Sequence, residues 1–301
     1  MGLLCDLSSH FDERLNPVEM SMSVLFRIFA LLWAAGATAC ANNCIKLDDH
    51  AGDLCGIQYT EMKTTSVHGL PSVSASLGDR TMTLLLDTGA SATVISAALI
   101  GRPNQSYYRL RDALCFDEHF CLENTLVYAW DTALSDAATE EINGVVGMDV
   151  LKHFSFRIKR GASLSLEHKA EPCAGASVPI TYNQNGTPTV DAHIDDLALS
   201  MLLDTGAAVC LLNDETAAAL APYFQENAVE AEGCTAEGCD DDVFSSSIAH
   251  LCIGDTCLDA VDTKYPAWNA VGSSFFSAYD VTFDFPNDTL RFCTEVNGYP
   301  D

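Results

Sequence analysis

The sequence predicts a mainly β fold of two homologous lobes with a few short helices. Three observations predict it: the second half of the chain repeats the first, short runs of alternating polarity recur in both halves, and helical periodicity is confined to short segments. Hydrophobic residues make up 48% of the 301 residues. This content is enough to bury a sizeable core, and it argues against disorder.

The internal repeat becomes visible when the chain is shifted by 117 residues. PSVSASLGDRTMTLLLDTGASATVISA, from Pro71, then falls on PTVDAHIDDLALSMLLDTGAAVCLLND, from Pro188, and ten of the 27 positions are identical without a gap. LCFDEHFCL from Leu114 resembles LCIGDTCL from Leu251 more loosely, and the segment from Gly144 resembles the one from Asn269. We therefore expect two lobes, residues 40–170 and 171–301.

The residue pattern of each predicted lobe is typical of β structure. Short alternating runs are separated by Gly, Asn, Asp and Pro, which favour turns. The clearest predicted strands are Ser72–Leu77, Thr83–Leu86, Val190–Ile194 and Val281–Phe285. The predicted helices are Asp214–Phe224, Val150–His153 and Ser273–Ala278.

The charge of the chain limits its partners. The formal net charge is −27 and the pI is about 4.3. No basic stripe is available to neutralise phosphates, so we expect no nucleic-acid partner. The same charge argues against binding to anionic lipid.

Residues 1–39 are expected to be a leader with a signal peptide. About a dozen apolar residues follow Arg27, fewer than the ~20 that span a bilayer, and Ala37-Thr38-Ala39 fits a cleavage site. The acidic stretch before Met20 is unlike a signal sequence, so translation is expected to start at Met20 or Met22. A buried core helix is the alternative. Cys40 is a lipidation candidate, so the protein is expected to be periplasmic, secreted or lipid-anchored, with membrane contact only through that anchor.

Export into an oxidising compartment accounts for the cysteines. Removal of the leader takes Cys5 from the 13 cysteines and leaves twelve. Cys210 lies in an apolar run and is expected to be a buried free thiol, which leaves Cys40 as the other odd cysteine. A zinc site with His119 is the alternative, but no two CxxC pairs occur, so we expect disulfides and no metal. The candidate pairs are Cys44–Cys55, Cys115–Cys121, Cys173–Cys293, Cys234–Cys239 and Cys252–Cys257.

The tetrapeptide Asp-Thr-Gly-Ala occurs twice, each time after an apolar run. The copies begin at Asp87 and Asp204. Thr-Gly breaks the strand into a tight loop, which holds the aspartate at the edge of apolar surface. A single copy is equally well explained by Asp capping a turn. Two copies in homologous halves predict that a pseudo-twofold axis brings the two carboxyl groups together.

The paired motif resembles the signature of the clan of retropepsin/pepsin-like aspartic proteases. In that signature, two apolar residues and a glycine follow the Asp-Thr-Gly by about sixty residues. Here Val145-Val146-Gly147 follows Asp87 and Ala270-Val271-Gly272 follows Asp204, with spacings of 60 and 68 from aspartate to glycine. VVGMDVL and the alanine after the glycine look like the retroviral form. The resemblance covers roughly residues 65–298.

The resemblance implies a bilobal aspartic protease fold with closed-barrel-like lobes, and an aspartic endopeptidase as the function. Asp87 and Asp204 would share a proton, because like charges ~3 Å apart do not both ionise easily, and would activate a water without a covalent intermediate. Thr88, Gly89 and Ala90, with Thr205, Gly206 and Ala207, would support the loops, and Gly147 and Gly272 would pack beside them. No cofactor is implied. The partner is a peptide or protein substrate, and a monomer suffices because one chain supplies both lobes.

Ala90 and Ala207 stand where many pepsin-like enzymes carry Ser or Thr. A hydroxyl there donates a hydrogen bond to the ionised carboxylate, which lowers its pKa. Because neither half has this hydroxyl, we expect a mildly acidic pH optimum, roughly 4–6.

The sequence departs from the family where a flap should cover the substrate. The segment Ser106–Asp117 lacks the glycines of a flap tip, and Tyr107, Tyr108 and Trp130 are the aromatic candidates, each of which has an ordinary buried aromatic as its alternative. The second half has its own flap candidate around Glu232–Asp242. A non-catalytic peptide-binding or scaffold protein on the same fold is the alternative function, and a narrow processing enzyme is a second one.

Overall fold

The computed structural model describes residues 44–56, 59–62, 65–67, 70–116, 120–130, 142–159, 163–167, 173–224, 229–235 and 238–293. The chain separates into two units, residues 1–43 and residues 44–301, and every feature below belongs to the second unit. The predicted leader and Cys40 therefore lie outside the described residues. No helix in the described ranges is long and apolar enough to cross a membrane.

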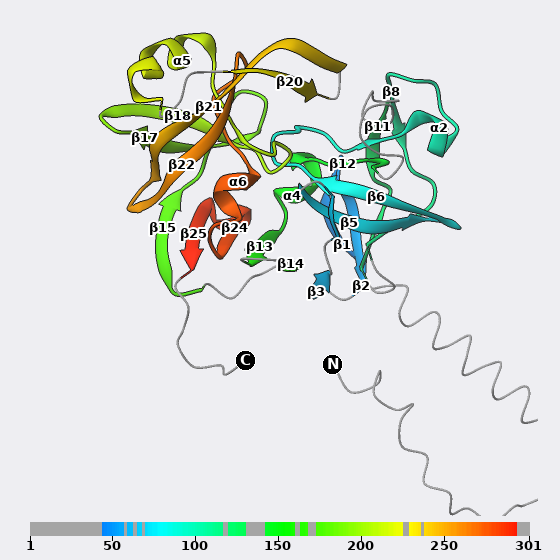
Figure 1. Ribbon diagram of the computed structural model, residues 1–301. Coiled ribbons are helices and arrows are strands. Elements are labelled where there is room, and N and C mark those ends of the chain that lie inside the picture. Colours follow the sequence, from blue (N-terminus) through cyan, green and yellow to red (C-terminus); the bar gives the residue numbers. More distant parts are fainter. Residues whose placement is uncertain are drawn as a thin grey trace, which may run out of the picture. The chain divides into compact units, whose positions relative to one another are not determined.

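Strands dominate the described residues, as predicted (Figure 1). The strands of the first half are β1 (Cys44–Asp48), β2 (Gly52–Gly56), β3 (Tyr59–Met62), β4 (Thr65–Val67), β5 (Leu70–Leu77), β6 (Arg80–Leu86), β7 (Val94–Ile95), β8 (Ser106–Arg109), β9 (Leu114–Cys115), β10 (Phe120–Glu123), β11 (Leu126–Ala129), β12 (Gly144–Val146), β13 (Ser155–Lys159) and β14 (Ser163–Glu167). Those of the second half are β15 (Gly175–Pro179), β16 (Thr181–Tyr182), β17 (Pro188–Ile194), β18 (Leu197–Leu203), β19 (Cys210–Leu211), β20 (Val229–Thr235), β21 (Gly238–Ile253), β22 (Thr256–Tyr265), β23 (Ala270–Val271), β24 (Val281–Asp284) and β25 (Thr289–Cys293).

The described helices are short; three lie at or near the predicted segments, and the one at residues 97–100 was not predicted. They are α2 (Ala97–Ile100), α4 (Met148–Leu151), α5 (Asp214–Leu220) and α6 (Ser273–Phe276), with 3₁₀ turns η1 (Ala221–Tyr223) and η2 (Phe285–Asn287). The side chain of Asn213 caps α5 by accepting a hydrogen bond from the N–H of Thr216 at 2.8 Å.

Each half of the chain forms one large sheet. The first runs β1-β2-β10-β9-β5-β6-β12-β7-β11-β8, with β4 on β5, and the second runs β16-β17-β18-β23-β19-β22-β21-β20. An additional pairing between β17 and β21 closes the second sheet into a barrel. The protein is thus mainly β with barrel-like sheets, as predicted.

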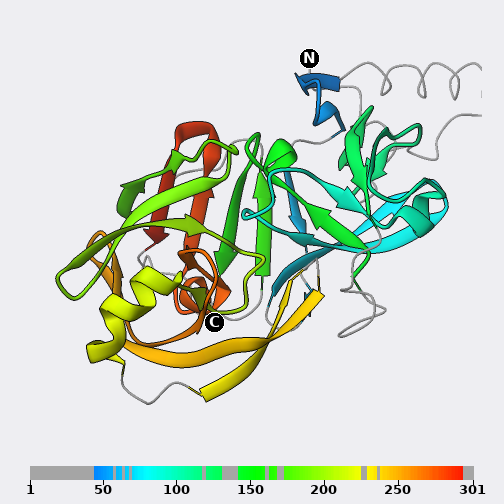
Figure 2. The same ribbon diagram turned by 90° about the horizontal axis from the view of Figure 1, so that it is seen from above.

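A third sheet takes strands from both halves. Its order is β15-β25-β24-β13-β14-β3, so three of its strands come from each half of the chain. At the junction, Phe156 on β13 faces Phe283 on β24, and their rings stack with centroids 4.4 Å apart. Figures 1 and 2 show β13 and β24 between the first-half and second-half strands. The repeated halves therefore share one hydrogen-bonded sheet.

The repeat is visible in the register of the central strands. In the first half β6 runs parallel to β12, with Leu86 opposite Val146; in the second β18 runs parallel to β23, with Leu203 opposite Val271. Leu86, Val146, Leu203 and Val271 are at most 1% exposed. Each half therefore ends a buried strand one residue before its aspartate.

Four of the five predicted disulfides are confirmed: Cys44–Cys55, Cys115–Cys121, Cys173–Cys293 and Cys252–Cys257. The fifth pair, Cys234 and Cys239, occupies facing register positions on β20 and β21, but these side chains lie outside those that the structure describes. Cys210 is a buried free cysteine, as predicted. Four disulfides are typical of proteins in an oxidising compartment outside the cytoplasm.

Candidate active site

The two aspartates occupy equivalent positions, at the ends of β6 and β18. The backbone N–H of Asp87 donates to the carbonyl of Val146 at 3.0 Å, and the N–H of Asp204 donates to the carbonyl of Val271 at 3.0 Å. Each parallel strand pair thus continues one hydrogen bond past its end. That bond fixes the point at which the chain turns into the Thr-Gly loop.

Thr88 and Thr205 tie the two loops together. The N–H of Thr88 donates to Thr205 Oγ1 at 3.1 Å, and the N–H of Thr205 donates to Thr88 Oγ1 at 3.0 Å. The hydroxyl of Thr88 also donates to the carbonyl of Leu203, and that of Thr205 to the carbonyl of Leu86, each at 2.5 Å. Both threonines are fully buried, so breaking this reciprocal set would leave buried polar groups unpaired.

Gly89 and Gly206 let each carboxyl group lie directly on the opposite loop. A Cβ at Gly89 would lie 2.6 Å from Cγ of Asp204, and a Cβ at Gly206 would lie 2.5 Å from Cγ of Asp87. No side chain fits at either position. The glycines also donate N–H bonds to their own aspartates, at 2.8 Å to Asp87 Oδ1 and 3.0 Å to Asp204 Oδ1.

Ala90 and Ala207 add a second backbone donor to each carboxyl group. The N–H of Ala90 lies 3.2 Å from Asp87 Oδ1, and the N–H of Ala207 lies 3.1 Å from Asp204 Oδ1. The side chains of both residues are methyl groups. These alanines therefore support the loops through their backbones alone.

Gly147 and Gly272 pack against the chain just beyond each loop. A Cβ at Gly147 would lie 2.5 Å from the backbone of Ala92, and one at Gly272 would lie 2.1 Å from the carbonyl oxygen of Val209. The N–H of Gly147 donates to Thr93 Oγ1 at 3.2 Å. In the second half Cys210 replaces Thr93, and its buried sulfur accepts the N–H of Gly272. The free cysteine thus has a packing role, and burial raises the pKa of its thiol to about 12.

The carboxyl groups of Asp87 and Asp204 are electrostatically linked. Burial, together with the charge of Asp204, raises the pKa of Asp87 to about 7, against the opposing effect of the N–H groups of Gly89 and Ala90. Burial also raises the pKa of Asp204, against the hydrogen bonds that it accepts. The hydrogen bond between the two side chains raises the pKa of Asp87 and lowers that of Asp204. Two adjacent carboxyl groups whose pKa values are both raised favour a single proton shared between them.

Trp268 makes the pair asymmetric, and the sequence analysis missed it. Its indole Nε1–H donates to Asp204 Oδ2 at 3.4 Å. Because Val146 and Val271 correspond, the equivalent first-half residue is Asn143, which accepts the backbone N–H of Thr83 at 2.8 Å instead. The repeat contained a signal for this residue. Trp268 precedes Val271 by three residues, whereas Asn143 holds the corresponding position before Val146.

The aromatic flap candidates of the first half pack against neighbouring first-half side chains. Tyr107 is 65% exposed and packs on Tyr128, with ring centroids 5.0 Å apart, and Trp130 meets the edge of Tyr128 at 6.3 Å. Tyr108 stacks under the guanidinium of Arg102, 3.8 Å from the ring centroid. Among the described contacts, none joins these residues to Asp87 or Asp204.

The two flap segments differ in length. The first-half candidate, residues 106–117, forms only the short strands β8 and β9, and Asp117 lies outside the described residues. The second-half candidate, residues 232–242, lies in the hairpin of β20 and the 16-residue β21, and residues 236–237 fall outside the described ranges. This hairpin extends toward the first-half strands in Figures 1 and 2.

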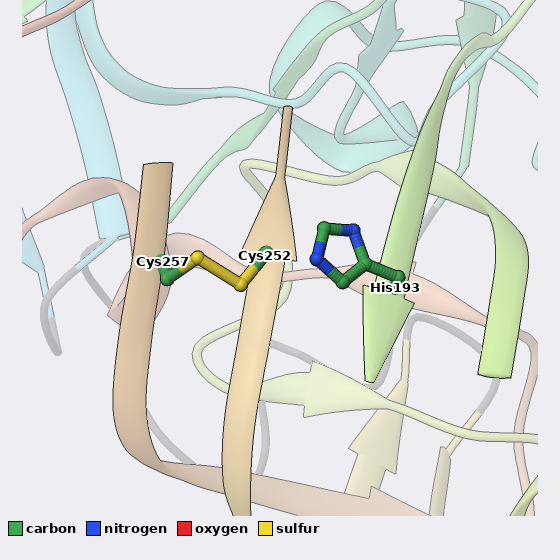
Figure 3. A group of neighbouring side chains, drawn as sticks. All are labelled: His193, Cys252 and Cys257. Carbon is green, nitrogen blue, oxygen red and sulfur yellow. A yellow bond between two sulfur atoms is a disulfide. The ribbon is translucent and has the colours of Figure 1, made fainter. Parts of the chain in front are cut away.

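Two groups of side chains have atoms close enough to share a metal ion, but their chemistry does not suit one. In the first, His193 lies beside Cys252 and Cys257, and Figure 3 shows the disulfide that joins these cysteines. The second combines Glu123 with the bonded pair Cys44–Cys55. Metal binding by cysteine requires thiolates, which a disulfide does not supply. Neither group is therefore assigned as a metal site.

A cavity of about 500 Å³ adjoins the aspartate pair. Gly89 and Ser91 line it from the first half of the chain. The second half contributes the turn between β16 and β17, the strand β18 and Trp268. The site thus combines a coupled carboxyl pair with an adjoining space of the size that ligands occupy.

Comparison with known proteins gives no match: neither a family model nor a curated protein corresponds to this chain. The function proposed below therefore rests on the residues of the chain itself.

Proposed function

We propose that the chain is an aspartic endopeptidase with two retropepsin-like lobes, in which Asp87 and Asp204 activate a water. One observation carries the proposal. Two Asp-Thr-Gly loops exchange threonine hydrogen bonds reciprocally, and each carboxyl group lies against the glycine of the other loop. Asp capping a turn, the simpler explanation for a single motif, needs no such exchange.

The asymmetry of the pair assigns the roles. The carboxylate of Asp204 takes a proton from the water as the water oxygen bonds to the carbonyl carbon of the peptide. Asp87 donates its proton to the carbonyl oxygen, which gives a neutral tetrahedral intermediate. The proton on Asp204 then passes to the peptide nitrogen as the C–N bond breaks. One hydroxyl of the intermediate returns a proton to Asp87, which restores the starting state.

The loop hydrogen bonds prepare this chemistry. Each carboxyl group accepts two backbone N–H bonds, which fix its orientation before substrate arrives. The asymmetry arises on the other oxygen of Asp204, which accepts the indole N–H of Trp268. Hydrogen bonds to a carboxylate favour its ionised form, and the extra donor on Asp204 suits it to the role of base.

The substrate is an extended peptide or protein segment bound beside the pair. Both aspartates come from one chain, so a monomer can be active. The four disulfides are consistent with an enzyme that works after export.

Carboxyl-to-amide substitutions test the proposal. Asp87→Asn and Asp204→Asn are each expected to lower peptide cleavage at least ~1,000-fold, because the amide neither shares the proton nor takes one from water. The control is Asp191→Asn, which removes an exposed carboxylate from β17. A peptide library cleaved between pH 3 and 7, with and without a hydroxyl-containing transition-state mimic, supplies the rates.

Thermal unfolding of each variant separates loss of chemistry from loss of fold. Cleavage that survives in either dyad variant would contradict the proposed roles. A folded wild-type chain that binds peptides but cleaves none would favour the non-catalytic peptide-binding protein.

A further inference from the structure

We propose that the cavity beside Asp204 is a substrate side-chain pocket that selects an uncharged amide, glutamine or asparagine, next to the cleaved bond. This inference rests on the proposed function, because it names the substrate class of the same site. The position, the lining and the asymmetry of the cavity support it.

The cavity adjoins Asp204 through residues of its lining. Two of its lining residues touch Asp204: Trp268 donates to its Oδ2, and the Cα of Gly89 lies under its carboxyl group. A peptide whose carbonyl sits at the aspartates therefore places a neighbouring side chain in this space.

The lining is polar but uncharged. Thr187 directly precedes β17, Thr189 on β17 lies opposite Leu202 on β18, and Ser200 lies two residues before Leu202. None of the ten lining residues carries a charge. Thr187, Thr189 and Ser200 thus bring hydroxyl groups to the cavity, and that of Thr189 also hydrogen-bonds the hydroxyl of Thr181 at 2.8 Å.

The turn between β16 and β17, which lines the other side of the cavity, is held by hydrogen bonds to one of its own side chains. Asn183 Oδ1 accepts the N–H of Asn185 at 2.9 Å and the N–H of Thr187 at 3.2 Å. The Asn183 side chain keeps its N–H donors for a ligand. Within the described part of the chain, no hydrogen bond occupies the side chains of Asn185, Ser91 or Ser200. The cavity therefore offers both donors and acceptors.

These groups fit an amide better than other side chains. An amide has two N–H donors and one acceptor, which match hydroxyl and amide partners. An acidic side chain would be repelled by the negative pair and by a chain of net charge −27. The same field would attract a basic side chain, but no lining residue offers that side chain a carboxylate to pair with. An apolar side chain would leave the polar groups unpaired, which costs free energy. The indole of Trp268, 48% exposed, offers a flat face for the amide plane.

The corresponding surface of the first half is closed. The 117-residue shift places Ser72 and Leu85 at the positions of Thr189 and Leu202, and both are at most 4% exposed. The polar pocket therefore lies on one side of the cleaved bond only, and the selection should appear at a single substrate position.

Matched peptides test the pocket. The full chain is produced in a host that does not glycosylate, because Asn185-Gly186-Thr187 is an acceptor sequence whose glycan would occupy the cavity. A library first locates the cleaved bond, and peptides with Gln, Met or Glu at each flanking position follow. We expect one position at which Gln gives a kcat/KM at least ~10-fold above Met and Glu.

Serine variants link that preference to the cavity. Ser200→Ala and Ser91→Ala are each expected to lower kcat/KM for the Gln peptide roughly 3- to 10-fold and to leave the Met peptide unchanged. Ser74→Ala, an exposed serine on β5, is the control. A preference for the Met peptide, or serine variants that slow cleavage of the Gln and Met peptides equally, would overturn the proposed amide pocket. Either result would leave the proposed endopeptidase activity standing. No cleavage of any peptide would overturn both.

Discussion

At the scale of single residues, the two aspartates differ in their side-chain hydrogen-bond donors. Asp87 and Asp204 receive the same backbone bonds, yet only Asp204 receives an indole N–H. A symmetric pair could place its proton on either carboxyl group. In the proposed mechanism, the hydrogen bond from Trp268 favours the ionised form of Asp204 and so the proton on Asp87; Trp268 also lines the cavity.

Trp268→Phe tests this bias by keeping an aromatic ring and removing the donor. Without the N–H bond the pKa of Asp204 rises, so the acid limb of the kcat/KM profile is expected to move to higher pH. The rate at the optimum is expected to fall roughly 3- to 10-fold. Trp130→Phe, whose described contacts do not reach Asp204, should leave the acid limb in place. An unmoved acid limb in Trp268→Phe would show that the donor does not control the pair.

The sequence predicts the aspartates and their loops because the repeat aligns them without a gap. Thr88, Thr205 and the paired glycines follow from that alignment. Trp268 escaped prediction because its role depends on an approach across the fold, and a tryptophan before a short strand has many uses. The expectation that neither carboxylate has a side-chain donor was therefore incomplete: Ala207 supplies none, but Trp268 does.

At the scale of elements, local strand patterns were predictable and their long-range partners were not. The predicted strand Val190–Ile194 lies within β17, and Ser72–Leu77 lies within β5. The pairing of β13 with β24 joins residues more than a hundred positions apart. Alternating polarity defines the faces of a strand but not its neighbour, so the shared sheet could not be foreseen.

The junction of β13 and β24 should carry much of the stability. Phe156 is 1% exposed and stacks on Phe283 at 4.4 Å. Phe156→Ala is expected to lower the free energy of unfolding by about 3–5 kcal/mol, through lost burial and the cavity left behind. Denaturant unfolding measures it, with Phe244→Ala, a 38% exposed ring on β21, as the milder comparison. Equal losses in the two variants would mean that the junction is no more stabilising than a surface strand.

At the scale of the whole molecule, the aspartate pair couples stability to pH. The pKa of Asp87 is raised in the folded chain to about 7. Its contribution to the free energy of unfolding is therefore fully present below the pKa of about 4 that it has in the unfolded chain, and is lost as pH rises through the folded-state pKa. The net charge of −27 adds repulsion in the same direction. We expect a higher thermal midpoint at pH 5 than at pH 7.5.

Asp48 has the opposite effect on the dependence of stability on pH. Burial raises its pKa, but hydrogen bonds from Lys152 and from the backbone of Ala51 and His50 outweigh this and lower it below its ordinary value. Its contribution is therefore present above about pH 4 and is lost as pH falls. Asp87→Asn should reduce the change in thermal midpoint between pH 5 and 7.5. It should leave the change at lower pH, to which Asp48 contributes, as it is in the wild-type chain. If the thermal midpoint instead rose between pH 5 and 7.5 by the same amount in the wild-type chain and in Asp87→Asn, the raised pKa of Asp87 would be contradicted.

The longest disulfide should stabilise more than the shortest. Cys173–Cys293 spans 120 residues and Cys252–Cys257 spans five. In the chain-entropy description, closing such loops contributes about 5 and about 2 kcal/mol respectively. Double substitution to alanine at each pair, followed by urea unfolding, compares them directly. A larger loss at Cys252–Cys257 would show that local packing outweighs loop closure.

The Cys173–Cys293 bond also brings the two ends of the second half together, with Cα atoms 5.5 Å apart. Gly175–Pro179 and Thr289–Cys293 run side by side from those ends. A segment whose beginning and end meet can be copied in tandem through a short connector, since the second copy starts where the first one stops. The disulfide and these two strands thus leave the second half with its beginning and end at one place, as a repeat joined in tandem requires.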